Sequence, residues 1–275
     1  MLAAVLNGEG MLTVEDLPRP DPDAGEILLR VRDCGICGSD LHAAKHPVAR
    51  LPAGTVMGHE FSGEIAALGR DVRGWHEGDR VVALPFMACG RCSACASDDT
   101  IHCLELRGLG LGQLPGAYAE YVRVQPASLL AIPRGVDYRR AALTEPLAVA
   151  LHGVRMAPVK QGTTCLVMGA GPIGLTTLLW CRDAGATVVV SEIAAGRGAL
   201  AARLGAAAVV DPRQDQPVGK IFALTGRGAE VVFECIGVRG TLNEALNYGS
   251  VHSSVVVLGV CMEPDEIFPM PAVLK

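Results

Sequence analysis

Apolar and polar residues follow two different patterns along the chain, and the change falls near residue 145. In residues 1–145, short apolar stretches are separated by turns rich in glycine, proline and aspartate. Such stretches are typical of β-strands. They begin at Glu26, Phe61, Arg80 and Ala119, with the sequences EILLRVRDC, FSGEIAAL, RVVAL and AEYVRV. The pattern therefore predicts a β-rich domain with many loops over residues 1–145.

Residues 146–275 alternate between apolar strands and helical segments. The predicted strands are CLVMG from Cys165, TVVVS from Thr187, AAVV from Ala207, EVVFEC from Glu230 and SVVVLG from Ser254. Between some of them lie PIGLTTLLWCRDAG, GRGALAARLGA and GTLNEALNYGS, whose apolar residues have helical spacing. Strands that alternate with helices predict a parallel sheet covered on both faces, so this domain is expected to have a doubly wound α/β fold.

Composition and charge narrow the range of partners. The chain has 275 residues, of which 50% are hydrophobic, and a formal net charge of -5. Because it has no cluster of lysine and arginine, we expect it to bind a small molecule rather than nucleic acid or an anionic membrane. The most apolar window, Thr163–Cys181, is interrupted by glycines and a proline, which favours a strand and a helix over a membrane span. The N-terminal residues do not resemble a signal peptide, so a cytoplasmic location with reduced thiols is expected.

Four cysteines lie in one short segment, ACGRCSACASDDTIHC. They are Cys89, Cys92, Cys95 and Cys103. Two successive CxxC steps followed by a fourth cysteine suit a tetrahedral zinc site formed by a single loop. The alternative is a set of buried or disulfide-paired cysteines. A site closed by four thiolates has no position for a substrate, so a structural zinc is predicted here and the chemistry is expected elsewhere.

A glycine-rich motif follows the first predicted strand of the second domain. Gly169, Gly171 and Gly174 form GxGxxG, with Pro172 and Ile173 between the last two. The glycines allow a tight turn, a close approach of backbone to a pyrophosphate, and close packing of helix against strand. The strand before the motif and the helix after it favour a dinucleotide site over an ordinary glycine-rich turn.

Glu192 ends the next strand, eighteen residues after Gly174. This is near the spacing expected of the acid that binds the ribose hydroxyls of a dinucleotide. A carboxylate at this position repels a 2′-phosphate, so NAD is predicted and NADP is less favoured. Two alternatives stay open: Glu192 as a solvated strand end, and Arg197 with Arg203 tolerating a phosphate.

Two short segments of the first domain carry further candidate metal ligands. CGICGSDLH contains Cys37 and His42, and GHEFSG contains His59 and Glu60. Cysteine and histidine suit zinc, and three protein ligands leave a fourth position open for an alcohol oxygen. Taken singly, each residue also has a structural explanation, such as a small buried thiol, a hydrogen-bonded turn histidine or a surface charge.

Several motifs together resemble one family. CGICGSDLH, MGHEFSGEI, GDRV, the four-cysteine segment, EPLAVALHG and GAGPIG occur in this order from the N-terminus to the second domain. The chain resembles the zinc-dependent medium-chain dehydrogenases, which include alcohol, sorbitol, threonine and 2,3-butanediol dehydrogenases. The resemblance implies a GroES-like catalytic domain (1–145), a Rossmann-type NAD-binding domain (146–275) and assembly into homodimers or homotetramers.

The resemblance also implies two zinc ions per chain. Cys37 and His59 match ligands of the catalytic zinc, and Glu145 stands where polyol and butanediol dehydrogenases have a glutamate ligand. Glu60 matches the acidic neighbour that binds the metal directly or exchanges with water. The lobe of residues 89–103 matches the structural zinc lobe of the family. A structural alternative for Glu145 is a helix-initiating acid.

The resemblance further implies hydride transfer between an alcohol and NAD. Ser39 matches the hydroxyl that passes the alcohol proton toward solvent, and His42 would continue this relay. Asp40 is expected to orient a metal ligand. Because a glutamate ligand makes the metal site richer in oxygen, a vicinal diol, polyol or hydroxyketone is the favoured substrate.

The chain departs from the family at its end, PMPAVLK, where relatives continue with another strand and a return segment. A C-terminally truncated chain is therefore expected, with an open sheet edge. Three other interpretations remain: a remnant that binds zinc and nucleotide without turnover, a zinc-independent quinone or enoyl reductase, and a zinc-ribbon that binds nucleic acid. A metal count of two per chain would favour the dehydrogenase over the zinc-independent reductase.

Overall fold

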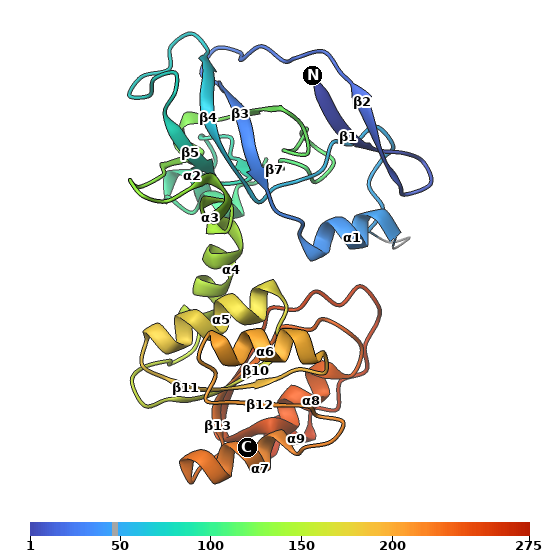
Figure 1. Ribbon diagram of the computed structural model, residues 1–275, viewed down its shortest axis with the longest axis vertical. Coiled ribbons are helices and arrows are strands. Elements are labelled where there is room, and N and C mark those ends of the chain that lie inside the picture. The colour runs from blue at the N-terminus through green and yellow to red at the C-terminus, as the bar shows by residue number, and fades with distance from the viewer. Residues whose placement is uncertain (46–48) are drawn as a thin grey trace. The chain divides into compact units, whose positions relative to one another are not determined.

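Figure 1 shows the computed structural model of the chain, coloured from the N-terminus to the C-terminus. The structure describes residues 1–45 and 49–275. The chain forms two compact units, Met1–Glu145 and Pro146–Lys275. Helix α4, Thr144–Arg155, contains the boundary between them.

The first unit is built on antiparallel strands. Five of them form a sheet in the order β8-β3-β4-β5-β9, and β1 pairs with β2 in a separate hairpin. The strand bounds are β1 Leu2–Leu6, β2 Leu12–Asp16, β3 Ile27–Cys34, β4 Phe61–Leu68, β5 Arg80–Ala83, β6 Phe86–Met87, β7 Arg107–Gly108, β8 Tyr121–Val124 and β9 Leu129–Ala131. Alternate residues of these strands are buried in one core, including Ile27, Leu29, Phe61 and Ile65.

Short helices connect the strands of the first unit. They are α1 Gly38–Lys45, α2 Ser93–Ala96, η1 Thr100–His102, η2 Pro126–Ser128 and α3 Tyr138–Ala141. Asp137 caps α3, because its side chain accepts a hydrogen bond from the backbone N–H of Arg140 at 2.7 Å. The pattern of the sequence predicts β3, β4 and β5 closely, but it does not predict the β1–β2 hairpin. All five side chains of β2 are exposed, so this strand has no buried face to mark it.

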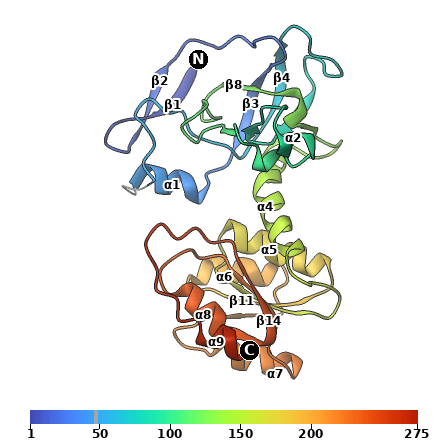
Figure 2. The same cartoon turned by 180° about the vertical axis from the view of Figure 1, so that it is seen from behind.

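The second unit contains a five-stranded parallel sheet in the order β12-β11-β10-β13-β14. The strand bounds are β10 Thr164–Met168, β11 Thr187–Ser191, β12 Ala208–Val210, β13 Ala229–Glu234 and β14 Gly249–Val257. The helices are α5 Pro172–Asp183, α6 Ala195–Arg203, α7 Pro217–Thr225, α8 Thr241–Tyr248 and α9 Met270–Leu274. Figure 2 shows β14 and α9 from the opposite side.

Two hydrophobic clusters lie on opposite faces of this sheet. One contains Val167 of β10 with Leu178 of α5 and Ala201 of α6. The other contains Leu166 of β10 with Ile221 of α7 and Ala245 of α8. Successive residues of a strand point to opposite faces, so both faces are covered by helices. This confirms the predicted α/β fold with a doubly wound sheet.

Two predicted strand bounds need correction, and one helix was not predicted. Strand β8 begins at Tyr121 rather than Ala119, and β14 begins at Gly249 rather than Ser254. The β13–β14 register shifts between Ala229 and Val231, and this irregularity separates the first residues of β14 from its apolar run. Helix α7 is not predicted, although Pro217 opens it and Gly226 ends it in the left-handed conformation.

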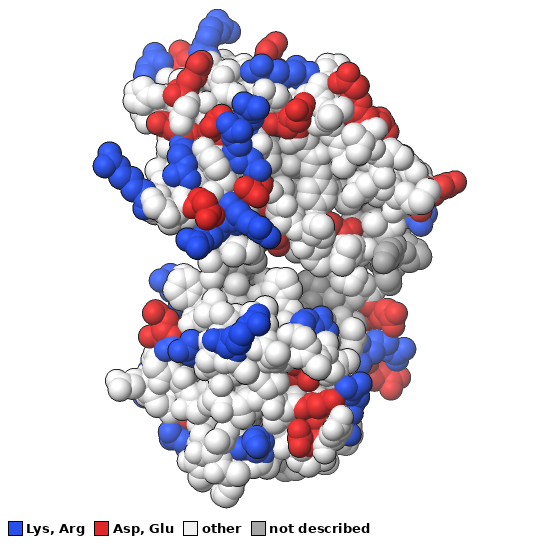
Figure 3. Space-filling view, in the orientation of Figure 1, with Lys and Arg blue, Asp and Glu red and all other residues white. Residues whose placement is uncertain are grey.

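The apolar window Thr163–Cys181 is divided between β10 and α5. Among the described residues, no helix is both long and apolar enough to span a bilayer. On the face that Figure 3 shows, acidic and basic side chains are interspersed over both units.

Candidate metal centres and nucleotide site

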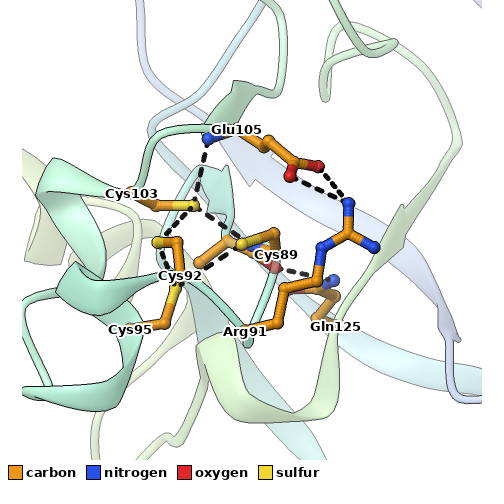
Figure 4. Close-up of polar contacts among 8 residues, drawn as sticks. Cys89, Arg91, Cys92, Cys95, Cys103, Glu105 and Gln125 are labelled. Atoms are coloured by element: carbon orange, nitrogen blue, oxygen red, sulfur yellow. Dashed lines mark hydrogen bonds and ion pairs between the residues drawn. The ribbon is translucent and has the colours of Figure 1, made fainter.

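The four cysteines of the lobe converge in the first unit (Figure 4). All of them are free thiols, and one ligand atom from each lies within 4.8 Å of the others. The Sγ–Sγ distances are 3.5 Å for Cys92 and Cys95, 3.9 Å for Cys92 and Cys103, and 4.0 Å for Cys89 and Cys95. The single turn of α2 and the 3-10 turn η1 fold the segment back on itself. This donor set fits a tetrahedral zinc.

Backbone N–H groups surround the sulfur atoms of the lobe. The N–H groups of Cys89 and Glu105 donate to Cys103 Sγ at 3.2 and 3.4 Å. Donation from the N–H groups of Cys95 and Leu104 lowers the pKa of Cys92 to about 6. Burial raises the pKa of Cys95 to about 11. Four thiolates this close together repel one another. A bound cation offsets this repulsion, so the group favours binding a metal ion.

An ion pair joins two residues of the four-cysteine lobe. Arg91 Nη2 lies 2.8 Å from both carboxylate oxygens of Glu105 (Figure 4). Gln125 Nε2 donates to the carbonyl of Ala88 at 3.5 Å, so the base of the lobe is joined to the segment after β8. The Arg91–Glu105 pair is exposed and is expected to contribute little to stability.

A second candidate metal centre is assembled by strand pairing. Strands β3 and β4 pair with Cys34 opposite Phe61, and the Gly35 N–H donates to the Glu60 carbonyl at 2.7 Å. The turn after β3 therefore lies beside the residues that precede β4. One ligand atom each from Cys37, His59 and Glu60 lies within 4.8 Å of the others. Below, these three residues are called the Cys37 group.

In the Cys37 group, His59 and Glu60 are buried and Cys37 is half-buried, and few positive charges face the group. Burial raises the pKa of Glu60, and the charge of His59 opposes this only in part. Burial likewise raises the pKa of the Cys37 thiol. Among the described residues, His59 Nδ1 is a buried atom without a hydrogen-bond partner. A thiol, an imidazole and a carboxylate in this condition fit a divalent cation such as zinc.

Helix α1 places further polar groups beside this site. Ser39 Oγ lies 3.5 Å from His59 Nε2. His42 is half-buried and lies three residues later on the same helix, so it can share a face with Ser39. Asp40 Oδ2 accepts the Cys37 N–H at 2.9 Å, and Asp40 Oδ1 lies 3.7 Å from His59 Nδ1.

Glu145 does not join the Cys37 group. It lies in the first turn of α4, where a carboxylate also suits the helix dipole. Burial raises the pKa of Glu145, while the charge of His59 lowers it and the charge of Glu60 raises it. The carboxylate therefore interacts electrostatically with the group but remains outside its 4.8 Å limit.

The glycine-rich loop joins β10 to α5 in the second unit. Gly169 has φ +87°, a conformation that favours glycine, and a Cβ on Gly174 would collide with the Gly169 carbonyl. A Cβ on Gly171 would meet no atom within 4 Å, so the backbone borders open space there. Pro172 and Ile173 begin α5, and no side chain caps its N-terminus. These features fit the pyrophosphate of a dinucleotide.

Glu192 lies directly beside this loop. Its Oε2 accepts the Ala170 N–H at 2.8 Å, and its Oε1 accepts the Ala194 N–H at 2.7 Å. Arg197 Nη2 lies 3.1 Å from Oε1. Burial alone would raise the pKa of Glu192, but the two N–H groups and the Arg197 guanidinium together hold the pKa below its ordinary value. Arg197 is thus paired with Glu192, a contact that the sequence alone does not indicate.

Comparisons with known proteins agree with this architecture. Residues 23–134 match the alcohol dehydrogenase GroES-like domain, and residues 172–275 match the zinc-binding dehydrogenase domain. The chain is 35% identical to (R,R)-butanediol dehydrogenase of Bacillus subtilis, over all of this chain and 82% of that protein. It is 33% identical to sorbitol dehydrogenase of Halalkalibacterium halodurans, over all of this chain and 80% of that protein.

A solved structure gives the same result for the fold. It is described as a zinc-binding dehydrogenase of Sinorhizobium meliloti 1021 bound to NADP, and it superposes with a TM-score of 0.91 at 35% identity. The match covers 99% of this chain and 81% of that chain. The fold and the two candidate metal centres define a zinc-binding dehydrogenase. The chain belongs to the zinc-dependent medium-chain dehydrogenase family.

Proposed function

We propose that the protein is an NAD-dependent oxidoreductase that transfers hydride between NAD and a secondary alcohol, with a vicinal diol or polyol as its preferred substrate. The observation that carries this proposal is the Cys37 group, in which three different donors converge, with His59 and Glu60 buried and Cys37 half-buried. A second, all-cysteine group in the same unit would hold the structural zinc. Membership in the dehydrogenase family supports this assignment.

Each residue of the first site has a distinct role in the proposal. Cys37 and His59 would hold the catalytic zinc, with Glu60 in the same group and Glu145 as a nearby carboxylate. When bound, the zinc supplies a Lewis acid for the substrate oxygen, and the nicotinamide supplies a hydride acceptor. Ser39 accepts the alcohol proton, and His42 passes it toward solvent.

The substrate class follows from the donors of the site. The carboxylate oxygen of Glu60 makes the site harder than one built from thiolates alone, and a harder site favours oxygen-rich ligands. A diol or polyol offers two adjacent oxygens. The related butanediol and sorbitol dehydrogenases act on such compounds according to their names, which supports this choice.

The cofactor follows from Glu192 and the glycine-rich loop. Gly169, Gly171 and Gly174 leave the backbone open to a pyrophosphate, with Pro172 and Ile173 at the start of the helix. The Glu192 carboxylate accepts hydrogen bonds from ribose hydroxyls and repels a 2′-phosphate. A relative is bound to NADP, so the preference of this chain for NAD is a proposal to be measured.

A substrate panel tests the proposal directly. NAD is offered with 2,3-butanediol, sorbitol, acetoin or ethanol, and the nicotinamide absorbance is followed with and without a chelator. We expect reduction of NAD with the diol or polyol, loss of turnover with the chelator, and recovery when zinc is added. Turnover of ethanol alone, or turnover that survives complete zinc removal, would contradict the proposal.

A further inference from the structure

Tyr118 lies between the two segments that carry the ligands of the Cys37 group. Its backbone N–H donates to the Met57 carbonyl at 2.8 Å, and the Ala117 N–H donates to the Gly58 carbonyl at 2.8 Å. Gly58 has φ +92°, and a Cβ at that position would lie 2.5 Å from Tyr118 Cδ1. The ring therefore packs against the residue that precedes His59, and only glycine leaves room for it.

The hydroxyl of Tyr118 reaches the other segment. Tyr118 Oη donates to Asp40 Oδ2 at 2.7 Å and lies 3.2 Å from the Gly35 carbonyl. The same Asp40 oxygen accepts the Cys37 N–H at 2.9 Å. One phenol thus holds the turn that contains Cys37, while its own backbone and ring hold the segment that contains His59.

The Tyr118 phenol remains a hydrogen-bond donor to Asp40. Burial raises the pKa of Tyr118, and the neighbouring Asp40 carboxylate raises it further, so the phenol keeps its proton. Asp40 is only 5% exposed, and loss of the phenol would leave part of its charge without a donor.

We propose that Tyr118 is the positioning residue of the Cys37 group: through Asp40 it fixes the turn of Cys37 relative to His59 and thereby sets the affinity of the group for its metal. The inference rests on the proposed function, because it assigns a metal to this group. Asp40 Oδ1 faces His59 Nδ1 at 3.7 Å, which is longer than a hydrogen bond. A carboxylate held at this position is the partner that a metal-binding histidine needs for its second nitrogen.

The variant Tyr118→Phe tests this role, because it keeps the ring against Gly58 and removes only the hydroxyl. Tyr121→Phe is the matched control, since the Tyr121 ring packs under the Arg19 guanidinium at 4.4 Å, outside the site. Zinc release is measured against increasing chelator concentration. We expect Tyr118→Phe to release the metal of the Cys37 group at an about 10-fold lower chelator concentration. The metal of the four-cysteine lobe is the internal reference and should be retained as in the wild type.

Two further measurements separate positioning from general destabilisation. The visible spectrum of the cobalt-substituted protein reports the ligand geometry, and Tyr118→Phe should change the bands of the Cys37 group but not those of the lobe. In the Asp40→Ala background, Tyr118→Phe should add little to the loss of metal affinity, because Asp40→Ala already removes the oxygen that accepts the Tyr118 hydroxyl.

The outcomes are distinguishable. Equal metal release from Tyr118→Phe and Tyr121→Phe would overturn the role of Tyr118, as would parallel loss of both metals or additive effects with Asp40→Ala. If the metal is lost as expected but the wild type oxidises no alcohol, the proposed function fails and the role of Tyr118 stands. If the wild type holds only the metal of the lobe, both are overturned.

Discussion

Glu60 in the first unit and Glu192 in the second are buried to the same extent but differ in how their charges are balanced. Each is 7% exposed. Burial raises the pKa of Glu60, and the charge of His59 offsets this only in part. For Glu192, two backbone N–H groups and Arg197 outweigh burial, and the pKa is lowered. The same degree of burial therefore produces opposite shifts.

This difference in charge balance indicates which kind of ligand each carboxylate suits. A buried carboxylate with too few positive partners becomes stable as an anion when a cation arrives, so the first site is suited to a metal. A carboxylate that fixed N–H donors already stabilise as an anion does not require a cation. Its remaining acceptor positions suit neutral hydroxyl groups, such as those of a ribose.

The largest expected effect comes from removing a ligand of the first site. Cys37→Ala should lower kcat for diol oxidation by about 10³-fold, because several kcal/mol of charge stabilisation by the metal are lost. Binding of NADH, which depends on the second unit, should be unchanged. Steady-state kinetics and NADH fluorescence titration measure the two properties separately.

Cys34→Ala is the control for this change. It removes the same thiol three residues earlier, where the sulfur donates weakly to the Gly35 carbonyl at 3.6 Å and lies outside the Cys37 group. Its kcat should stay within a few-fold of the wild type. Equal losses in the two variants would mean that the metal site does not depend on Cys37, and the contrast between the two regions would disappear.

A smaller effect is expected from Glu192→Gln. This variant keeps an acceptor but loses the charge, and a hydrogen bond to a neutral group is weaker than one to a charged group by about 1.4 kcal/mol. The preference for NAD over NADP, taken as the ratio of the two kcat/KM values, should fall about 10-fold. Metal content should not change.

Glu230→Gln is the matched control for Glu192→Gln. Glu230 also has a lowered pKa, because the N–H and hydroxyl of Thr164 donate to it, but it lies at the opposite ends of the strands from the glycine-rich loop. It should leave the cofactor ratio unchanged. A ratio that is unaffected in Glu192→Gln would show that Glu192 serves only the local backbone.

The features that the sequence predicts best are formed by residues close together along the chain. The four lobe cysteines lie within residues 89–103, so their spacing alone indicates convergence. Strands β4 and β11 have the predicted bounds, because Glu60 and Gly69 flank β4, while Gly185 and Glu192 lie close to the two ends of β11. The glycine-rich loop was predictable for the same reason, since one strand, one turn and one helix define it.

The features of the two sites that the sequence does not predict depend on contacts between residues in different elements of the chain. Tyr118 is separated from Asp40 by 78 residues, and no spacing rule connects them. Glu145 was expected beside Cys37 and His59, but its distance is set by where α4 begins, and the structure keeps it outside the group. The pairing of Arg197 with Glu192 likewise depends on how α6 packs after β11.

The smallest expected effect is a pH dependence of opposite sign at Glu60 and Glu192, measured by denaturant unfolding of zinc-free protein. The lowered pKa of Glu192 gives stability that is present above the ordinary value of 4.5 and is lost as the pH falls through the folded-state pKa. The advantage of the wild type over Glu192→Gln, about 1 kcal/mol, should therefore vanish at low pH.

The raised pKa of Glu60 has the reverse consequence, because folding favours the protonated form of this carboxyl. Relative to Glu60→Gln, the wild type should lose stability as the pH rises from 4.5 through the folded-state pKa. Parallel slopes for the two variants would show that both carboxylates are balanced in the same way.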